Sequence, residues 1–172
     1  MRGVLIFLIA IIATQCYAHL HIIGANYGGR DVTDTVRRLV RGGKLRVSAS
    51  NGVFGDPKWG TVKTLVIAYR YGDSTPEVAC AREGGEIHIT TDNESTYNRN
   101  PGDITVFGAF YGPKDVSPKF ADLGNSGSKV QAANHNFGDP LYGYAKTLCA
   151  CYEDRSGKIQ FKCAWEGQHL YL

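Results

Sequence analysis

The sequence lacks any apolar run long enough to cross a membrane. Its longest run covers residues 4–13, well short of the ~20 apolar residues that a spanning helix needs. Arg2 precedes this run, and the small residue Ala18 closes the segment that follows it. This order is typical of a secretory signal peptide cleaved after Ala18. We therefore predict no membrane span and a secreted, extracellular protein that begins at His19.

A strong excess of charge of either sign is also missing. The chain has 19 basic and 16 acidic residues, and loss of the signal peptide leaves 18 against 16, a formal charge of +2. A nucleic-acid-binding protein normally carries a clear basic patch. The densest cluster here comprises Arg37, Arg38, Arg41 and Lys44, which fits the solvated side of one helix. We therefore predict no nucleic-acid partner.

Common catalytic motifs are absent as well. The chain contains no Gly-x-Ser-x-Gly sequence and no glycine-rich phosphate loop. A zinc site is disfavoured because the Cys-Ala-Cys sequence at residues 149–151 lacks the usual two-to-four-residue spacing. These absences favour a protein that is not an enzyme and that carries no cofactor.

What the chain does contain is an internal repeat. Residues 46–57 (RVSASNGVFGDP) are echoed by residues 129–140 (KVQAANHNFGDP), an offset of 83 positions. Upstream the offset changes by one, so that residues 24–28 match residues 108–112. Two copies are too few for a solenoid, which usually needs at least three. The repeat therefore predicts a pseudo-symmetric pair of units.

Both copies predict the same order of elements: strand, helix, strand, hairpin and final strand. In the first copy we expect strands at residues 21–25, 45–48, 62–71, 77–82 and 86–89. In the second copy the clearest strands are expected at residues 104–109, 145–152, 158–165 and 169–172. Thr33 and Ser117 are predicted to cap the short helices, which glycines at 42–43 and at 124 are predicted to end.

The fold class that follows is mostly β, with two tandem pseudo-symmetric β-rich repeats. Each repeat is expected to hold antiparallel hairpins and one short helix, in a sandwich-like arrangement. The predicted boundaries are a signal peptide at 1–18, repeats at 19–89 and 104–172, and a linker at 90–103. In the linker, Asn93 begins an Asn-Glu-Ser glycosylation sequence. A unit of about 70 residues buries a thin core, so we expect the two copies to pack together.

Four cysteines remain after the signal peptide is removed, and an even number in a secreted chain indicates disulfides. With a hairpin turn centred on Ser156, Cys149 lies opposite Cys163 at a distance that a disulfide can bridge. Cys80 and Cys151 would then have to join the two repeats. The pairing of Cys151 with Cys163 and of Cys80 with Cys149 remains the alternative.

The predicted mature N-terminus provides one metal hypothesis. A terminal His19 could bind copper through its amine and imidazole, and His21 could complete a square-planar set that uses deprotonated backbone amides. The simpler interpretation is that a histidine happens to follow the cleavage site. Copper binding or copper-dependent oxidation is therefore an alternative function and not the leading one.

Asp56 and Asp139 form a repeated pair of carboxylates, which is the kind of pair that glycosidases use. Each stands in a Gly-Asp-Pro sequence, where aspartate readily caps a turn. A catalytic pair needs two different environments, whereas equivalent positions in two repeats are alike. Pairing of Lys63 with Glu83, and of its counterpart Lys146 with Glu166, is the structural role that we expect for the neighbouring charges.

Aromatic residues in the repeated turns suggest a ligand surface. Trp59 and Tyr142 follow the two Phe-Gly-Asp-Pro sequences, and Tyr27 and Tyr111 occupy the other repeated turn. Aromatic rings on loops, beside amides such as those of Asn51 and Asn134, are suited to binding sugars. Packing between loops is the alternative explanation for the same residues.

The first copy resembles the C-terminal domain of the DnaJ-like C11 co-chaperone family. The resemblance covers residues 22–89 and rests on four short segments, ANYG at 25–28, DVT at 31–33, FGDP at 54–57 and KTL at 63–65. That domain belongs to intracellular, mitochondria-associated proteins. This chain differs in its signal peptide and in having no J domain and no His-Pro-Asp sequence. The resemblance therefore implies neither co-chaperone activity nor catalytic residues.

Three functions are consistent with these features. The first is a secreted non-enzymatic binding protein whose partner is an extracellular glycan or another protein. The second is a copper protein centred on His19, and the third is a structural protein of an extracellular matrix or of defence. The oligomeric state does not follow from the sequence.

Overall fold

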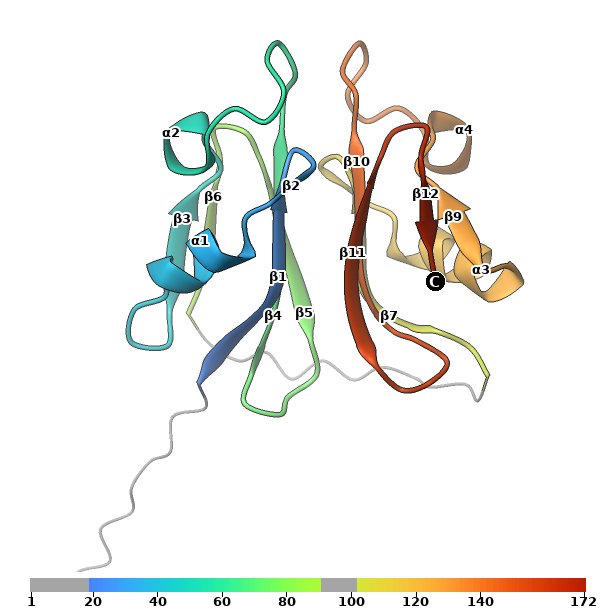
Figure 1. The fold of residues 1–172 in the computed structure, drawn as a ribbon, viewed down its shortest axis with the longest axis horizontal. Helices are drawn as coiled ribbons and strands as arrows, with labels where there is room; N and C mark the ends of the chain where they lie inside the picture. Colours follow the sequence, from blue (N-terminus) through green and yellow to red (C-terminus); the bar gives the residue numbers. More distant parts are fainter. Residues whose placement is uncertain (1–18, 91–101) are drawn as a thin grey trace, which may run out of the picture.

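In the computed structural model, residues 19–90 and 102–172 are described, and they form a mostly β structure with short helices (Figure 1). We call residues 19–90 the first half and residues 102–172 the second half. The predicted fold class is confirmed in this respect. The predicted signal peptide and Asn93 lie outside the described residues.

The two halves have the same order of elements. The first half contains β1 (Leu20–Tyr27), β2 (Arg30–Asp31), α1 (Thr33–Leu39), β3 (Leu45–Ser48), α2 (Asn51–Phe54), β4 (Thr64–Tyr71), β5 (Glu77–Arg82) and β6 (Glu86–Ile89). The second half contains β7 (Thr105–Tyr111), β8 (Lys114–Asp115), α3 (Ser117–Ser126), β9 (Lys129–Gln131), α4 (Asn134–Phe137), β10 (Thr147–Glu153), β11 (Ile159–Trp165) and β12 (His169–Tyr171).

Strand pairing also corresponds between the halves. The first half has a sheet of order β2-β1-β4-β5, and the second half has β8-β7-β10-β11. In each half the hairpin predicted from the sequence, β4–β5 or β10–β11, is antiparallel and pairs as expected. The remaining strands form two small sheets, β3–β6 and β9–β12. The halves therefore agree in order and pairing, while their origin as copies of one unit stays a prediction.

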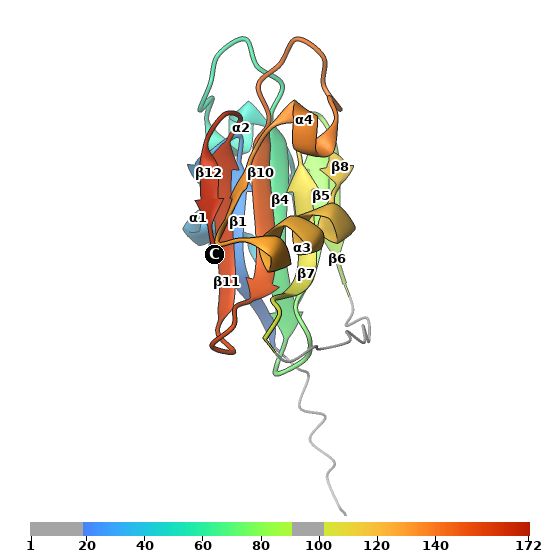
Figure 2. The same cartoon turned by 90° about the vertical axis from the view of Figure 1, so that its right-hand side faces the viewer.

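The two four-stranded sheets face each other at the centre of the molecule, and the helices and small sheets lie outside them (Figures 1 and 2). Alternation along β4 explains this arrangement, because successive side chains of a strand point to opposite faces. Leu65 and Ile67 enter the core of the first half. Ala68 points the other way and packs between the sheets with Phe107 and Cys151.

Glycines allow the two sheets to approach closely. A Cβ atom at Gly24 would lie 2.2 Å from Cδ1 of Phe161, and one at Gly108 would lie 2.7 Å from Cβ of Val78. The repeat places Gly24 and Gly108 at equivalent positions, and likewise Val78 and Phe161. Each half therefore offers a glycine to a bulky residue of the other half, as expected for a self-complementary interface.

The prediction of one short helix per repeat is wrong, because each half contains two helices. The segments Asn51–Phe54 and Asn134–Phe137, for which the sequence predicts no helix, form single-turn helices, α2 and α4. Gly55 and Gly138 follow these helices with φ of 73° and 79°, a backbone conformation that glycine adopts without steric cost. A single helical turn has no amphipathic period, so the sequence pattern could not distinguish it from a β-turn.

The caps of the longer helices also differ from the prediction. Thr33 is the first residue of α1, and its Oγ1 accepts a hydrogen bond from the Ala25 amide at 2.9 Å instead of capping the helix. Ser117 makes the same bond to the Ala109 amide. Helix α3 continues through Gly124, which is buried against Ile104. Close packing, and not helix termination, therefore explains this glycine.

The disulfide prediction is correct for one pair and wrong for the other. Cys149 and Cys163 are directly opposed on β10 and β11 and form a disulfide. Cys80 and Cys151 are free thiols, so neither predicted arrangement joins the halves. Strand β5, which carries Cys80, packs against β7, whereas β10 packs against β4. Hence the inter-sheet packing sets these two cysteines on different strand pairs.

Across the described ranges, no helix is both long and apolar enough to traverse a bilayer.

Candidate functional site

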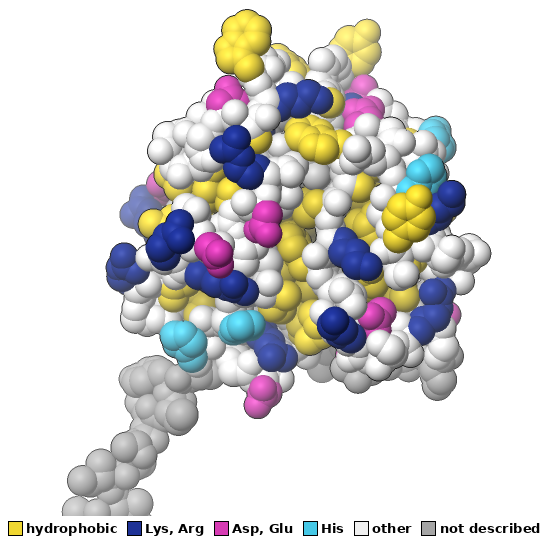
Figure 3. Space-filling view, in the orientation of Figure 1, with side chains coloured by type: hydrophobic (Ala, Val, Ile, Leu, Met, Phe, Trp, Pro, Cys, Tyr) yellow, Lys and Arg dark blue, Asp and Glu magenta, His cyan; other side chains and the backbone are white. Residues whose placement is uncertain are grey.

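Two neighbouring loops carry the most exposed aromatic residues. The loop at residues 55–63 joins α2 to β4, and the loop at 138–146 joins α4 to β10; both rise at the top of Figure 1. Trp59 and Tyr142 are each 92% exposed. Figure 3 shows hydrophobic side chains standing out along the same edge of the molecule. These two rings are therefore available to a ligand.

Beneath each loop a buried lysine holds two carboxylates. Lys63 is only 3% exposed, and its Nζ lies 3.0 Å from Oδ1 of Asp56 and 3.3 Å from Oε2 of Glu83. Glu83 Oε2 also accepts the backbone amide of Lys63 at 3.0 Å. A buried ammonium is stable only when it is paired in this way. The expected Lys–Glu pairing is confirmed, and the aspartate joins it.

The second half repeats this cluster. Lys146 Nζ lies 2.8 Å from Oδ1 of Asp139 and 3.3 Å from Oε2 of Glu166. Each aspartate is thus neutralised by the lysine of its own half, an arrangement that anchors the base of a loop. The two carboxylates also have matching surroundings, whereas a glycosidase pair requires different ones.

Tyr27 and Tyr111 are not part of a binding surface, contrary to the prediction. Both rings are fully buried. The Tyr27 hydroxyl donates a hydrogen bond to Oδ1 of Asn51 at 3.0 Å, and the Tyr111 hydroxyl donates one to Oδ1 of Asn134 at 2.9 Å. Burial, followed by the nearby Glu83 carboxylate, raises the pKa of Tyr27 above its ordinary value. The sequence pattern could not show that these two residues end β1 and β7 and that their rings enter the cores of the two halves.

The pKa of Tyr111 is raised for the same reasons, with Glu166 in the place of Glu83. Both tyrosines therefore stay protonated and act as hydrogen-bond donors at neutral pH. Their amide partners differ in position, because Asn51 lines the hollow described next whereas Asn134 is exposed at the start of α4.

A hollow of about 380 Å³ opens beside Trp59. Its principal lining residues are Asn51, Asp56, Trp59, Lys63, Glu83 and Tyr144. Tyr144 belongs to the loop of the second half, so both loops contribute to the hollow. Sequence reasoning missed Tyr144 because its counterpart in the first repeat is Thr61. A search for aromatic residues present in only one copy would have found it.

This hollow combines aromatic rims with a polar floor. The rings of Trp59 and Tyr144 can present flat apolar faces, and the Asn51 amide and the two carboxylates can form hydrogen bonds. Both carboxylates already contact Lys63, which leaves neither as an unpaired base. The geometry therefore suits recognition of a polar ligand better than acid–base catalysis.

The histidines proposed as copper ligands lie at the opposite end of the molecule. His19 is exposed just before β1, and His21 pairs with Arg70 within the β1–β4 ladder. Partial burial and then the charge of Arg70 lower the pKa of His21. Wrapping copper in the backbone amides of residues 20 and 21 would break this pairing. Within residues 19–90 and 102–172, no group of three or more His, Cys, Asp or Glu side chains could hold a metal.

Comparison with known proteins found no matching family model and no significant match to a curated protein or a solved structure. The resemblance to the DnaJ-like C11 C-terminal domain therefore stays a prediction. Functional inference for this chain has to come from its own geometry.

Proposed function

We propose that the protein is a secreted, non-enzymatic binding module that recognises extracellular glycans through the loops at residues 55–63 and 138–146. The observation that carries this proposal is the exposure of Trp59 and Tyr142, 92% each, beside a polar hollow. Exposed apolar surface that gathers at one edge and is rimmed by polar residues marks an interaction site. The flat faces of the two rings stack well on the apolar faces of sugar rings.

The surroundings of the rings favour a glycan over a charged polymer. The mature chain carries a formal charge of only +2, and the lysine at the base of each loop is already paired with two carboxylates. A neutral, hydroxyl-rich ligand needs stacking and hydrogen bonds but no strong opposite charge. Trp59 and Asn51 supply these two kinds of contact in one hollow.

Secretion is part of the proposal. The disulfide between Cys149 and Cys163 belongs to the chemistry of oxidising compartments, where such bonds persist. The predicted signal peptide at residues 1–18 would direct the chain into the secretory pathway.

Two aromatic loops at one edge would also allow two contacts with a repetitive polymer, and linked contacts strengthen binding through effective concentration.

A glycan array tests the proposal. We expect the wild-type protein to bind a defined subset of glycans and the Trp59→Ala/Tyr142→Ala double variant to lose at least about tenfold in affinity, which corresponds to about 1.4 kcal/mol. Tyr171→Ala is the matched control, because Tyr171 is an exposed aromatic of β12 and does not line the hollow. An array with no binding would instead favour a structural role in a matrix or in defence.

A further inference from the structure

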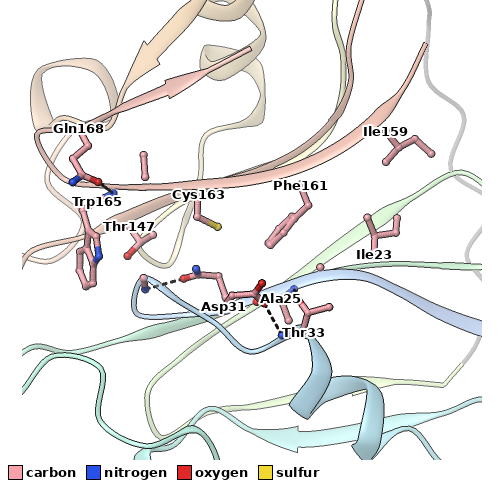
Figure 4. Close-up of a pocket in the computed structure, with 14 residues that line it drawn as sticks. Ile23, Ala25, Asp31, Thr33, Thr147, Ile159, Phe161, Cys163, Trp165 and Gln168 are labelled. Atoms are coloured by element: carbon pink, nitrogen blue, oxygen red, sulfur yellow. Dashed lines mark hydrogen bonds between the residues drawn. The ribbon is translucent and has the colours of Figure 1, made fainter. Parts of the chain in front are cut away.

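A second cavity lies between the two halves, and no residue of the loops at 55–63 and 138–146 lines it. It is a groove of about 500 Å³, bounded by β1 and β2 of the first half and by β11 of the second (Figure 4). In Figure 4, Trp165, Cys163 and Phe161 follow one another along β11 and face Asp31 and Thr33 across the groove. We call this cavity the inter-half groove.

Two aromatic contacts define the groove. Trp165 packs on Gly29, where an added Cβ would lie 2.1 Å from ring atom Cε2. Phe161 packs on Gly24 in the same manner, at 2.2 Å. Both rings line the space between these contacts. Ligand pockets in proteins usually measure about 300–1,000 Å³, so this groove has room for a single sugar ring or a disaccharide.

Two buried polar side chains lie in the groove without full hydrogen bonding. Asn26 is 6% exposed, and its Oδ1 accepts the Gly29 amide at 2.8 Å. Its Nδ2 and the hydroxyl of Thr147, a residue that is 8% exposed, make no hydrogen bond to a described residue, and neither atom is fully withdrawn from solvent. An amide donor and a hydroxyl therefore remain available to a ligand.

Asp31 and Gln168, which are more exposed, provide two further hydrogen-bonding groups in the groove. Asp31 uses Oδ1 to accept the amide and hydroxyl of Thr33, at 2.9 and 2.6 Å, which leaves its Oδ2 as an acceptor. Gln168 uses Oε1 to accept the Trp165 amide at 3.2 Å, which leaves its Nε2 as a donor. The groove thus offers donors and acceptors in close succession, as a molecule rich in hydroxyl groups requires.

The charged side chains at the inter-half groove restrict the net charge of the ligand that it can bind. Among the described residues that line the groove, Asp31 is the only charged one, which disfavours phosphates, sulfates and other anions. A cation bound beside Trp165 would be repelled by the ammonium of Lys58, whose Nζ lies 4.5 Å from the centroid of the Trp165 ring. A neutral ligand with many hydroxyl groups fits both conditions.

Comparison of the two copies shows that several groove residues have no chemical equivalent at the corresponding positions of the other copy. Position by position, Asn26 corresponds to Phe110, Gln168 to Gly85 and Trp165 to Arg82. The groups that make the groove polar and aromatic are therefore not needed by the fold in both halves. By contrast, Asp31 corresponds to Asp115, which bonds Ser117 as Asp31 bonds Thr33.

We propose that the inter-half groove is a binding site for one unit of a neutral saccharide, with Asn26, Asp31, Thr147 and Gln168 hydrogen-bonding its hydroxyl groups. This inference rests on the proposed glycan-binding function for its ligand class, but it uses none of the loop-tip residues. It adds a single asymmetric site to the two exposed rings. A glycan held in the groove would be recognised by one unit, whereas the loops contact the polymer around it.

The test compares two aspartates that have the same local role. Asp31→Ala and Asp115→Ala remove the same pair of hydrogen bonds at the start of a helix, so both should cost similar stability. Binding of cellohexaose, mannohexaose and chitohexaose is measured by calorimetry, with thermal melting as the folding control. We expect at least one probe to bind the wild type, Asp31→Ala to weaken it at least about tenfold, and Asp115→Ala to leave it unchanged.

Gln168→Ala provides a second variant, since this exposed side chain can be removed without disturbing the core, and it should weaken binding in the same direction. Equal affinity of wild type, Asp31→Ala and Gln168→Ala for the bound probe overturns the groove proposal. Loss of binding only in Trp59→Ala/Tyr142→Ala overturns it while supporting the loops. Loss only in the groove variants supports the groove and removes the loop proposal, and absence of binding to all three probes contradicts both.

Discussion

At the residue scale, Lys63 and Lys146 are buried charges that are each fixed by two ion pairs. Each is almost completely withdrawn from water and is held by an aspartate and a glutamate that keep partial contact with solvent. An ion pair of this kind is costly to break, because the remaining partners lose their compensation. The lysines therefore fix the base of the two loops that carry the exposed rings.

We expect Lys63→Met to destabilise the protein by roughly 3 kcal/mol, the lower end of the range for broken buried pairs, because the two carboxylates stay partly hydrated. Urea unfolding monitored by circular dichroism measures the change. Lys146→Met should have a similar effect, since the two clusters share their geometry. Lys44→Met, at an exposed position, should remain within about 0.5 kcal/mol of wild type. A Lys63→Met protein as stable as wild type would contradict this role.

The free thiols lead to a second expectation. Burial raises the pKa of Cys151 to about 12, and burial together with the charge of Asp115 raises that of Cys80 to about 12. Only the thiolate reacts with alkylating agents, and at pH 8 about one thiol in ten thousand is ionised at such a pKa. Native protein should therefore incorporate almost no iodoacetamide at pH 8, and the rate should rise about tenfold per pH unit.

Mass spectrometry measures this labelling. Unfolding in urea should expose both thiols and add two alkyl groups, while Cys149 and Cys163 stay unlabelled without a reductant. Rapid labelling of Cys151 in the native protein at pH 8 would show that it is not buried, and rapid labelling of Cys80, which is partly exposed, would show that the pKa of its thiol is not raised.

At the scale of elements, the sequence predicts the local pairings and misses the distant ones. The hairpin register that places Cys149 opposite Cys163 follows from alternation and from the position of the turn. The β3–β6 and β9–β12 sheets join strands about 40 residues apart, and no local pattern specifies such partners. The single-turn helices α2 and α4 are too short to produce a helical period.

The hairpin disulfide provides a prediction at this scale. Replacing Cys149 and Cys163 together by alanine should lower the free energy of unfolding by about 3 kcal/mol, the value expected from loop closure for a separation near 15 residues; the separation here is 14. Urea unfolding measures the loss. Dithiothreitol should reduce the stability of the wild type to that of the variant and leave the variant unchanged. Insensitivity of the wild type to the reductant would show that the bond contributes nothing.

At the scale of the whole molecule, the sequence predicts that two units pack together but not which groups meet. The equivalence of Gly24 and Gly108 is visible in the repeat, whereas their contacts with Phe161 and Val78 depend on the angle between the sheets. The candidate sites show the same limit. Trp59 and Tyr142 can be recognised because they stand in repeated loops, whereas the inter-half groove depends on Asn26, Trp165 and Gln168, which have different counterparts in the other copy.

Close approach of the two sheets makes Gly108 a sensitive position. An added methyl group would lie 2.7 Å from Cβ of Val78, so Gly108→Ala should destabilise the protein by about 2 kcal/mol through overpacking. Adding Val78→Gly in the same chain should cost less than the sum of the two single changes, because it removes Cβ and Cγ2, the two atoms that would lie at 2.7 Å. Urea unfolding of the wild type, the two single variants and the double variant gives a double-mutant cycle, which measures the interaction free energy between the two positions.

Gly52→Ala is the control for the cycle, because an added methyl group there would meet only Ser50 Oγ, at 3.8 Å. A glycine-to-alanine change as such should therefore leave stability almost unaffected at that position. If Gly108→Ala is harmless, or if its cost simply adds to that of Val78→Gly, the two sheets do not meet at this contact. Because Gly24 and Phe161 form the equivalent contact on the other side, such a result would also remove the boundary on which the inter-half groove depends.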